Sequence, residues 1–231
     1  MAESIQIISL GGSIVAPDGV DVGYLKRFRA VVGSFLRGEH TRRLILVVGG
    51  GGPARAYQES YRSIVDAAED ESQDWIGIAA TRLNAELVRA LLSDFCDGPV
   101  VIDPTRSKVP GRVIVAAGWK PGFSTDNVAV MLGERYGAKR IINLSNIPKV
   151  YTADPKVDPA ARPLDTLSWT AFRKIVGATW VPGKNTPFDP IASKRADELA
   201  MEVVVAAGRD VDNLQAILEG RTFVGTTIGP N

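Results

Sequence analysis

Short apolar runs alternate with longer segments of helical periodicity along most of the chain. Such runs are typical of strands in a largely parallel sheet. The expected strands are Ile5–Leu10, Leu44–Val48, Val100–Ile102, Val113–Ala116, Arg140–Leu144, Val203–Ala206 and Phe223–Thr227. The expected helices are Tyr24–Leu36, Pro53–Asp66, Trp75–Phe95, Thr125–Tyr136, Thr170–Val176, Pro190–Leu199 and Val211–Glu219. This alternation predicts an α/β fold in which helices cover both faces of the sheet.

The stretch from about Asn146 to Phe188 has weaker strand signals. Its prolines are Pro148, Pro155, Pro159, Pro163, Pro182 and Pro187. This density of proline fits either a second lobe or a set of lid loops.

Composition narrows the class of protein. The 231 residues suffice for one large α/β domain or two small ones, and 45% hydrophobic with 23% charged residues is ordinary for a soluble protein. A net charge of +1 provides no general attraction to nucleic acid or membrane, so any anion site must be local. The start of the chain lacks the features of a signal peptide, and no run approaches the ~18 apolar residues of a membrane span.

Cysteine and histidine are nearly absent from the chain. The single Cys96 excludes an internal disulfide framework, and the single His40 excludes histidine metal sites and histidine triads. We expect His40 to be a solvated residue of a polar turn. This composition favours a reducing compartment, and we expect a cytoplasmic protein in which no side-chain cluster holds a metal.

Two glycine-rich loops follow the first two expected strands: Gly11-Gly12-Ser13 and Gly49-Gly50-Gly51-Gly52. Glycine lets the backbone turn sharply and approach a ligand, and a helix that begins just beyond points its free N–H groups there. The first loop could be only a tight turn. Four consecutive glycines exceed what a turn needs, so close approach to a ligand is the better interpretation of the second. Together the loops suggest a site for more than one phosphate group.

Further polar residues follow strands at the same expected edge of the sheet. Ser124, Thr125 and Asp126 begin a helix, where they could bind phosphate and orient a metal or lysine, or only cap the helix. Tyr151 could lie against a purine and Asp154 could bond a base or ribose; the alternative is a proline-bounded hairpin with a packed tyrosine. Arg55 could add a charge beside bound phosphate or be a surface arginine. Asp189 caps a helix that begins with Pro190, and Lys194, one turn further on, is either a site residue or simply exposed.

Two standard nucleotide motifs match incompletely. Gly49-x-Gly51-x-x-Ala54 fits the dinucleotide fingerprint, with Asp70 and Glu71 about 20 residues on. Those acids lie in a polar run rather than at a strand end. The segment from Gly177 to Lys184 is one residue too long for a P-loop and ends in Asn185, so we reject that motif.

Taken in order, several short motifs resemble the amino acid kinase family and, within it, the archaeal-type uridylate (UMP) kinases. The resemblance runs nearly end to end. The matching pieces are Leu10-Gly11-Gly12-Ser13, Val47-Val48-Gly49-Gly50-Gly51 with Ala54-Arg55, Asp74-Trp75-Ile76-Gly77-Ile78 with Thr81-Arg82, Pro121-Gly122 with Thr125-Asp126, Val150-Tyr151-Thr152-Ala153-Asp154-Pro155, Asp189-Pro190 with Ala192 and Lys194, and Gly225-Thr226-Thr227-Ile228.

The resemblance implies a three-layer α/β/α sandwich in a single domain over residues 1–231. Its acceptor-side lobe would be roughly 1–140 and its ATP-side lobe roughly 141–231. The implied reaction is transfer of the ATP γ-phosphoryl group to UMP with Mg²⁺, in pyrimidine nucleotide biosynthesis. The implied partners are small-molecule nucleotides and further copies of the chain, with a hexamer as one form.

The resemblance also implies roles for individual residues. The ATP-side positions are Gly12, Ser13, Gly51, Arg55, Ser145, Asn146, Tyr151 and Asp154. The UMP-side positions are Gly50, Asp74, Trp119, Lys120, Pro121, Gly122, Phe123, Ser124 and Thr125. Asp126 matches the organising acid of the family.

The chain departs from the family pattern at three places. Ser9 stands where much of the wider family has a lysine, a change that the archaeal-type kinases share. The candidate cations for the γ-phosphate are Lys120, Lys149, Lys184 and Lys194, of which we expect Lys120 or Lys194. Pro148-Lys149 replaces the usual Asp-Gly of the ATP-side loop. Trp119 and Lys120 replace a common threonine and histidine, and Trp119 could stack on a base or merely pack.

Three alternatives to a UMP kinase stay open on the sequence. One is a relative that binds nucleotide or oxyanion without catalysis, as a sensor or store, which Ser9 and Pro148-Lys149 motivate. Another is an enzyme of the same family with a different small acceptor. The third is a nicotinamide-dependent oxidoreductase, which rests only on Gly49, Gly51 and Ala54.

Overall fold

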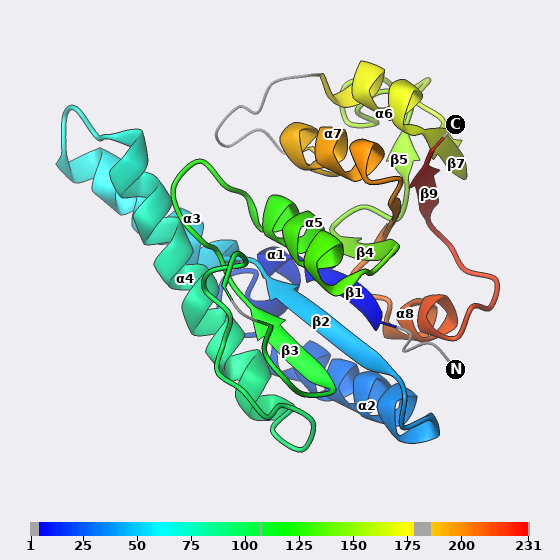
Figure 1. Ribbon diagram of the computed structural model, residues 1–231. Coiled ribbons are helices and arrows are strands. Elements are labelled where there is room, and N and C mark those ends of the chain that lie inside the picture. Colours follow the sequence, from blue (N-terminus) through cyan, green and yellow to red (C-terminus); the bar gives the residue numbers. More distant parts are fainter. Residues whose placement is uncertain (1–4, 107, 178–185, 231) are drawn as a thin grey trace.

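A computed structural model of the chain describes residues 5–106, 108–177 and 186–230. Its main sheet has seven strands in the order β3-β2-β1-β4-β8-β9-β7 (Figure 1). In chain order these are β1 (Ile5–Leu10), β2 (Arg43–Val48), β3 (Val113–Ala116), β4 (Arg140–Ser145), β7 (Thr166–Ser168), β8 (Glu202–Ala207) and β9 (Thr226–Gly229). All neighbours pair in parallel except β8 and β9. The expected mostly parallel sheet is confirmed.

Helices lie on both faces of this sheet, as a three-layer α/β/α arrangement requires (Figure 1). Helices α2, α4 and α8 pack on one face, and α5, α6 and α7 pack on the other. The helices are α1 (Gly12–Val15), α2 (Val22–Gly38), α3 (Gly51–Ile64), α4 (Asp70–Leu91), α5 (Thr125–Tyr136), α6 (Trp169–Val176), α7 (Pro190–Glu198) and α8 (Val211–Leu218). Helices α3 and α4 run beside each other and extend past the sheet.

Alternation along the central strands explains why both faces are covered. In β1, Ile8 faces the α2 side and Ile7 faces the α5 side, and both are fully buried. Burying such a side chain stabilises the fold by about 1.5–3 kcal/mol relative to exposing it. A strand that is apolar toward both faces therefore needs a helical layer on each. None of the helices in the described part of the chain is long and apolar enough to cross a membrane.

Two expected strands differ from those observed. Val100–Ile102 forms only a bridge between Val101 and Ala116, since Asp103 accepts hydrogen bonds from Thr105 and turns the chain away. The last strand begins at Thr226 instead of Phe223. Before it, the side chain of Asn213 pairs with both backbone groups of Val224, which removes that residue from the sheet.

The proline-rich stretch contains elements that the sequence did not predict. Strands β5 (Val150–Tyr151) and β6 (Pro163–Leu164) form a separate antiparallel pair, and β7 joins the edge of the main sheet. The short helix α1 was likewise missed. His40 lies exposed in a turn, as expected.

Candidate active site

The carboxyl ends of three adjacent strands bring the two glycine loops together. The Gly11 N–H donates to the Leu144 carbonyl at the end of β4, at 3.0 Å. The Gly49 N–H donates to the Leu10 carbonyl at the end of β1, also at 3.0 Å. Ligands of open α/β sheets bind at this edge, so the loops lie where the sequence analysis expected a site.

The glycine loops contact each other backbone to backbone. A Cβ on Gly12 would lie 2.1 Å from the Gly51 nitrogen and 2.5 Å from the Gly49 carbonyl carbon. Gly51 also has a φ of +67°, which side chains other than glycine rarely adopt. Ligand approach alone was therefore an incomplete interpretation of the glycine run, because contact between the loops itself requires glycine.

Side chains brace these loops from two helices. Asn84 of α4 donates to the carbonyls of Gly49 and Gly50, at 2.9 and 3.0 Å. Arg55 of α3 donates to the Ser13 hydroxyl at 3.0 Å and to the Pro17 carbonyl at 3.2 Å. Arg55 and Ser13, both predicted on the ATP side, therefore lie together. Asn84 was not a predicted site residue, since an asparagine within a helix carries no distinctive sequence signal.

A buried polar cluster joins β1, α5 and α7. The Ser9 hydroxyl donates to Asp126 Oδ1 at 2.9 Å, and the Asp189 N–H donates to Oδ2 at 3.1 Å. Asp189 is buried and caps α7, where its side chain accepts from the Ala192 N–H at 2.7 Å. Asp126 is thus held by one residue from each of two other elements, which the sequence could not reveal.

Burial raises the pKa of Asp126 from its ordinary value of 3.8 to about 6. The hydrogen bond from Ser9 lowers this pKa, the nearby charge of Asp189 raises it, and the Asp189 backbone N–H lowers it. The folded protein therefore binds a proton between about pH 4 and pH 6 that the unfolded chain releases. It follows that the ionisation of Asp126 lowers the free energy of unfolding as the pH rises through this window.

We expect the Asp126 carboxyl of the ligand-free protein to titrate with a midpoint near pH 6, the raised value. Ser9→Ala should move this midpoint higher, since it removes a hydrogen bond that favours the ionised form. The measurement is the carbon-13 shift of the carboxyl across pH 3 to 9, with Asp126→Asn to assign the signal. A midpoint near 4 in the wild type, or a fall in Ser9→Ala, would contradict this account.

The loop after β3 carries most of the predicted acceptor residues. Asp74 Oδ2 accepts from the Gly122 N–H at 2.8 Å, so two of these residues meet directly. The rings of Trp119 and Phe123 lie 4.7 Å apart, and Lys120 Nζ is 4.1 Å from the centre of the Trp119 ring. Pro121, Ser124 and Thr125 lie along the same segment, where Ser124 caps α5 and Thr125 begins it. Gly50, the remaining predicted residue, lies in the second glycine loop at the N-terminus of α3.

The predicted residues after β4 are more dispersed. Ser145 ends β4, and its hydroxyl accepts from the Ile147 N–H at 3.3 Å. Asn146 follows directly, whereas Tyr151 lies in the β5-β6 hairpin and is partly buried. The Asp154 carboxylate accepts from the Lys156 N–H at 2.9 Å, within its own turn. The antiparallel pairing of β5 with β6 fits the proline-bounded hairpin that the sequence offered as an alternative for this segment.

The candidate lysines occupy different surroundings. Lys194 has a 75% exposed side chain whose ammonium lies 4.0 Å from Glu198, one turn along α7. Lys149 pairs with Asp165. Lys120 lies over the aromatic rings of its own loop. Lys184 lies outside the described residues, as does most of the rejected P-loop segment.

The acids of the dinucleotide fingerprint do not reach a strand end. Asp70 and Glu71 form the first turn of α4, beyond the whole length of α3 from the glycine loop. A ribose-binding acid belongs at the end of the next strand, so the oxidoreductase alternative loses its support.

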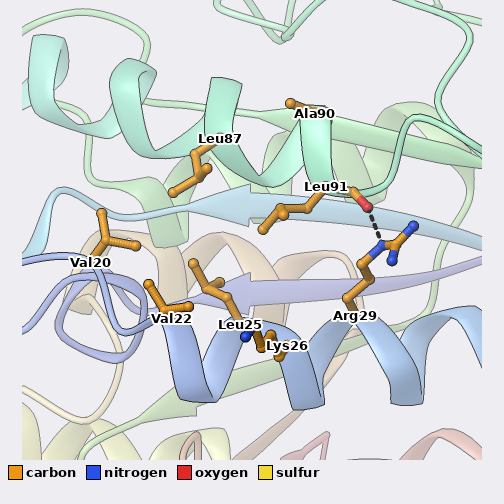
Figure 2. A pocket seen from close by; sticks show the side chains of 8 residues that line it. All are labelled: Val20, Val22, Leu25, Lys26, Arg29, Leu87, Ala90 and Leu91. Atoms are coloured by element: carbon orange, nitrogen blue, oxygen red, sulfur yellow. Dashed lines mark hydrogen bonds between the residues drawn. The ribbon is translucent and has the colours of Figure 1, made fainter.

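An apolar groove lies between α2 and α4, apart from these residues (Figure 2). Leu25 and Leu91 face each other across it, and Arg29 Nε donates to the Leu91 carbonyl at 2.7 Å. Its lining residues are Val20, Val22, Leu25, Lys26, Arg29, Leu87, Ala90 and Leu91. The groove contains none of the predicted nucleotide-binding residues.

Comparison with known proteins matches residues 4–207 to the Amino acid kinase family. The chain is 38% identical to the uridylate kinase of Methanospirillum hungatei, over 97% of this chain and 94% of that protein. It is 36% identical to that of Thermoplasma volcanium, over 99% and 98%. The crystal structure of uridylate kinase from Archaeoglobus fulgidus superposes with a TM-score of 0.82 at 32% identity, covering 97% of this chain and 99% of that one.

Proposed function

Because this chain belongs to the amino acid kinase family, we propose that it is a uridylate kinase that transfers the γ-phosphoryl group of ATP to UMP. One observation carries the proposal: the near-complete coverage at 38% identity to a named uridylate kinase. The geometry agrees with it, since two abutting glycine loops and a buried acid meet at the carboxyl edge of the sheet. The relatives named above are kinases, which favours this function over the non-catalytic alternative.

We assign the two nucleotides to opposite sides of the glycine loops. ATP would be bound by Gly12, Ser13, Gly51, Arg55, Ser145, Asn146, Tyr151 and Asp154. UMP would be bound by Gly50, Asp74 and the loop from Trp119 to Thr125. The contacts between Arg55 and Ser13, and between Asp74 and Gly122, support this division because each joins residues of one set. The lobes at roughly 1–140 and 141–231 would follow the same division.

Phosphoryl transfer depends on alignment of two anionic groups and on stabilisation of the charge of the transferred group. Arg55 of α3 offers a guanidinium for this purpose. The first turn of this helix adds few backbone donors, since the Gly52 N–H donates to the Ala16 carbonyl at 2.8 Å and Pro53 has no N–H. Lys120 and Lys194 are the proposed cations for the γ-phosphate. Both side chains are exposed and therefore accessible to a nucleotide from solvent.

Asp126 would order this region. Its carboxylate connects β1, which leads into the first glycine loop, with the N-terminus of α7, which carries Lys194. We therefore assign it the organising role: it holds the cation-bearing helix at a fixed distance from the phosphate loops.

The site also fits a magnesium ion that arrives with ATP. The described residues contain no group of three metal-ligating side chains, and Mg²⁺ commonly relies on substrate phosphates, water and only one or two carboxylates. When bound, the ion would neutralise charge on the phosphate oxygens. Asp126 is the carboxylate of this region that could hold one of its waters.

The acceptor is tested by an ADP-release assay over UMP, CMP, AMP, GMP and small carboxylic acids. We expect UMP to be the preferred substrate. Turnover of another small acceptor without turnover of UMP would point to the alternative family member. Calorimetric ATP binding without transfer to any acceptor would support the sensor or storage alternative.

We further propose that the chain is cytoplasmic and forms a homo-oligomer, with a hexamer as one form. The groove of Figure 2 supports assembly, because Val20 and Val22, two of its lining residues, are 49% and 56% exposed. Apolar surface that is exposed in this way is favourably buried against another protein surface.

We expect light scattering to give a mass several times the 24.7 kDa of one chain. Leu87→Glu, which places a charge in the groove, should reduce this mass. Val157→Glu is the control, since Val157 is 80% exposed and lies outside the groove. A wild-type monomer would refute assembly, and an unchanged mass in Leu87→Glu would exclude this groove as the contact.

A further inference from the structure

Helix α4 anchors the backbone of the acceptor loop at three points. Thr81 Oγ1 accepts from the Gly118 N–H at 2.8 Å, and Arg82 Nη2 donates to the Trp119 carbonyl at 3.0 Å. Asp74 Oδ2 accepts from the Gly122 N–H at 2.8 Å. Positions seven and eight residues apart lie close together around a helix, so these side chains share the face that meets the loop.

The three anchors are not equivalent. Thr81 is 7% exposed and also donates to the Ile78 carbonyl, so it is an integral part of the helix–loop packing. Asp74 already belongs to the proposed UMP-binding set. Arg82 is the only one of the three that binds a carbonyl of the loop, and it does so at Trp119, whose ring meets that of Phe123 edge to face. It therefore controls the orientation of the peptide that carries the aromatic side chain.

The guanidinium of Arg82 has a further N–H group besides the one that binds the Trp119 carbonyl. Its centre lies 5.9 Å from the centre of the Trp75 ring, where a cation–π attraction holds it. Its Nε is buried and has no hydrogen-bond partner within the described part of the chain. A buried donor of this kind is unfavourable unless some group accepts from it. The side chain is thus fixed between a tryptophan on its own helix and the loop, with one N–H still to be satisfied.

We infer that Arg82 is a positioning residue for the acceptor nucleotide. This inference rests on the proposed function. Arg82 fixes the Trp119 peptide, so that the side chains of Trp119, Lys120 and Phe123 are already ordered before the acceptor nucleotide binds. Without it, the loop keeps its anchors at Gly118 and Gly122, but the residues between them must be ordered at the cost of binding energy. Loss of Arg82 should therefore weaken the binding of UMP and leave the binding of ATP unchanged.

The test compares Arg82→Ala, Arg82→Lys and the control Arg89→Ala. Arg89 lies on the same helix and pairs with Glu86 at the surface, at 2.7 Å. We expect Arg82→Ala to raise the KM for UMP by about tenfold or more, since one lost anchor of about 1.4 kcal/mol corresponds to tenfold. The KM for ATP should change less than about twofold. Arg82→Lys, which keeps a donor for the Trp119 carbonyl, should lie between wild type and Arg82→Ala.

A second measurement does not depend on turnover. Hydrogen–deuterium exchange of the amides from Gly118 to Gly122 should be faster in Arg82→Ala than in the wild type or Arg89→Ala, and UMP should slow it. Equal changes in the two KM values, or unchanged exchange in the loop, would overturn the role of Arg82. If Arg82→Ala does not fold, the same two readouts on Arg82→Lys decide the question. Failure of the wild type to phosphorylate UMP would instead refute the proposed function.

Discussion

Asp126→Asn is expected to lower kcat by about 10²- to 10³-fold, the usual loss when one preorganised electrostatic group is removed from an active site. The affinity for ATP should change by less than about threefold, because the groups that we propose bind its phosphates remain. The amide is nearly the same shape as the carboxylate but has no charge. It also cannot present two acceptors to the Ser9 hydroxyl and the Asp189 N–H, which lie 2.9 and 3.1 Å from the carboxylate oxygens.

The melting temperature distinguishes this loss of turnover from a loss of folded protein. Because burial raises the pKa of Asp126, its ionised form destabilises the folded protein above about pH 6. Asp126→Asn should therefore melt at the same temperature as the wild type or higher at pH 7.5, while its turnover falls. The control is Asp94→Asn, whose 67% exposed side chain pairs with Arg29 at the surface. Unchanged kcat, or loss of ATP binding with full turnover at saturation, would contradict the organising role.

Gly12→Ala is expected to abolish activity and to destabilise the protein by about 3 kcal/mol or more, at the upper end of overpacking effects. The added Cβ would lie 2.1 Å from the Gly51 nitrogen, 2.5 Å from the Gly49 carbonyl carbon and 2.6 Å from that of Gly50. All three are backbone atoms, which cannot rotate aside as a flexible side chain could. The two loops must therefore separate, which disrupts the phosphate site that we propose for them.

The measurements are the urea midpoint and the rate of ADP formation. Gly19→Ala provides the matched control, because a Cβ there meets no atom within 4 Å and Gly19 has no positive φ. It should keep wild-type stability within about 0.5 kcal/mol, as surface substitutions usually do. Normal stability and activity in Gly12→Ala would show that the loops do not pack as described.

Much of the fold could be predicted because the central strands are buried on both sides. Ile5–Leu10, Val113–Ala116 and the helix Thr125–Tyr136 have the predicted bounds. In the two strands the run of apolar residues sets the bounds. In the helix the hydrophobic pattern agrees with the N-cap, where the Ser124 hydroxyl accepts from the Asn127 N–H at 3.1 Å. Local signals of this kind depend only on neighbours along the chain, so the sequence is sufficient to find them.

Two of the differences from the predicted strands arise from contacts with residues outside the segments themselves. Phe223–Thr227 has the composition of a strand, but Asn213 holds Val224 out of the sheet. Thr166–Ser168 is an edge strand only because it pairs with β9, some 60 residues further along the chain. Neither contact can be recognised from the residues on either side of the segment in the sequence.

By itself, the sequence determined the alternation of strands and helices, the glycine loops, and the family resemblance with its candidate residues. Only the tertiary structure decided which of those residues meet. Ser9 and Asp126 are 117 positions apart, and Asp126 and Asp189 are 63 apart. Gly12 and Gly51 touch because β1 and β2 are parallel neighbours in register. Such contacts depend on the order in which strands join the sheet, which is a property of the whole packed chain.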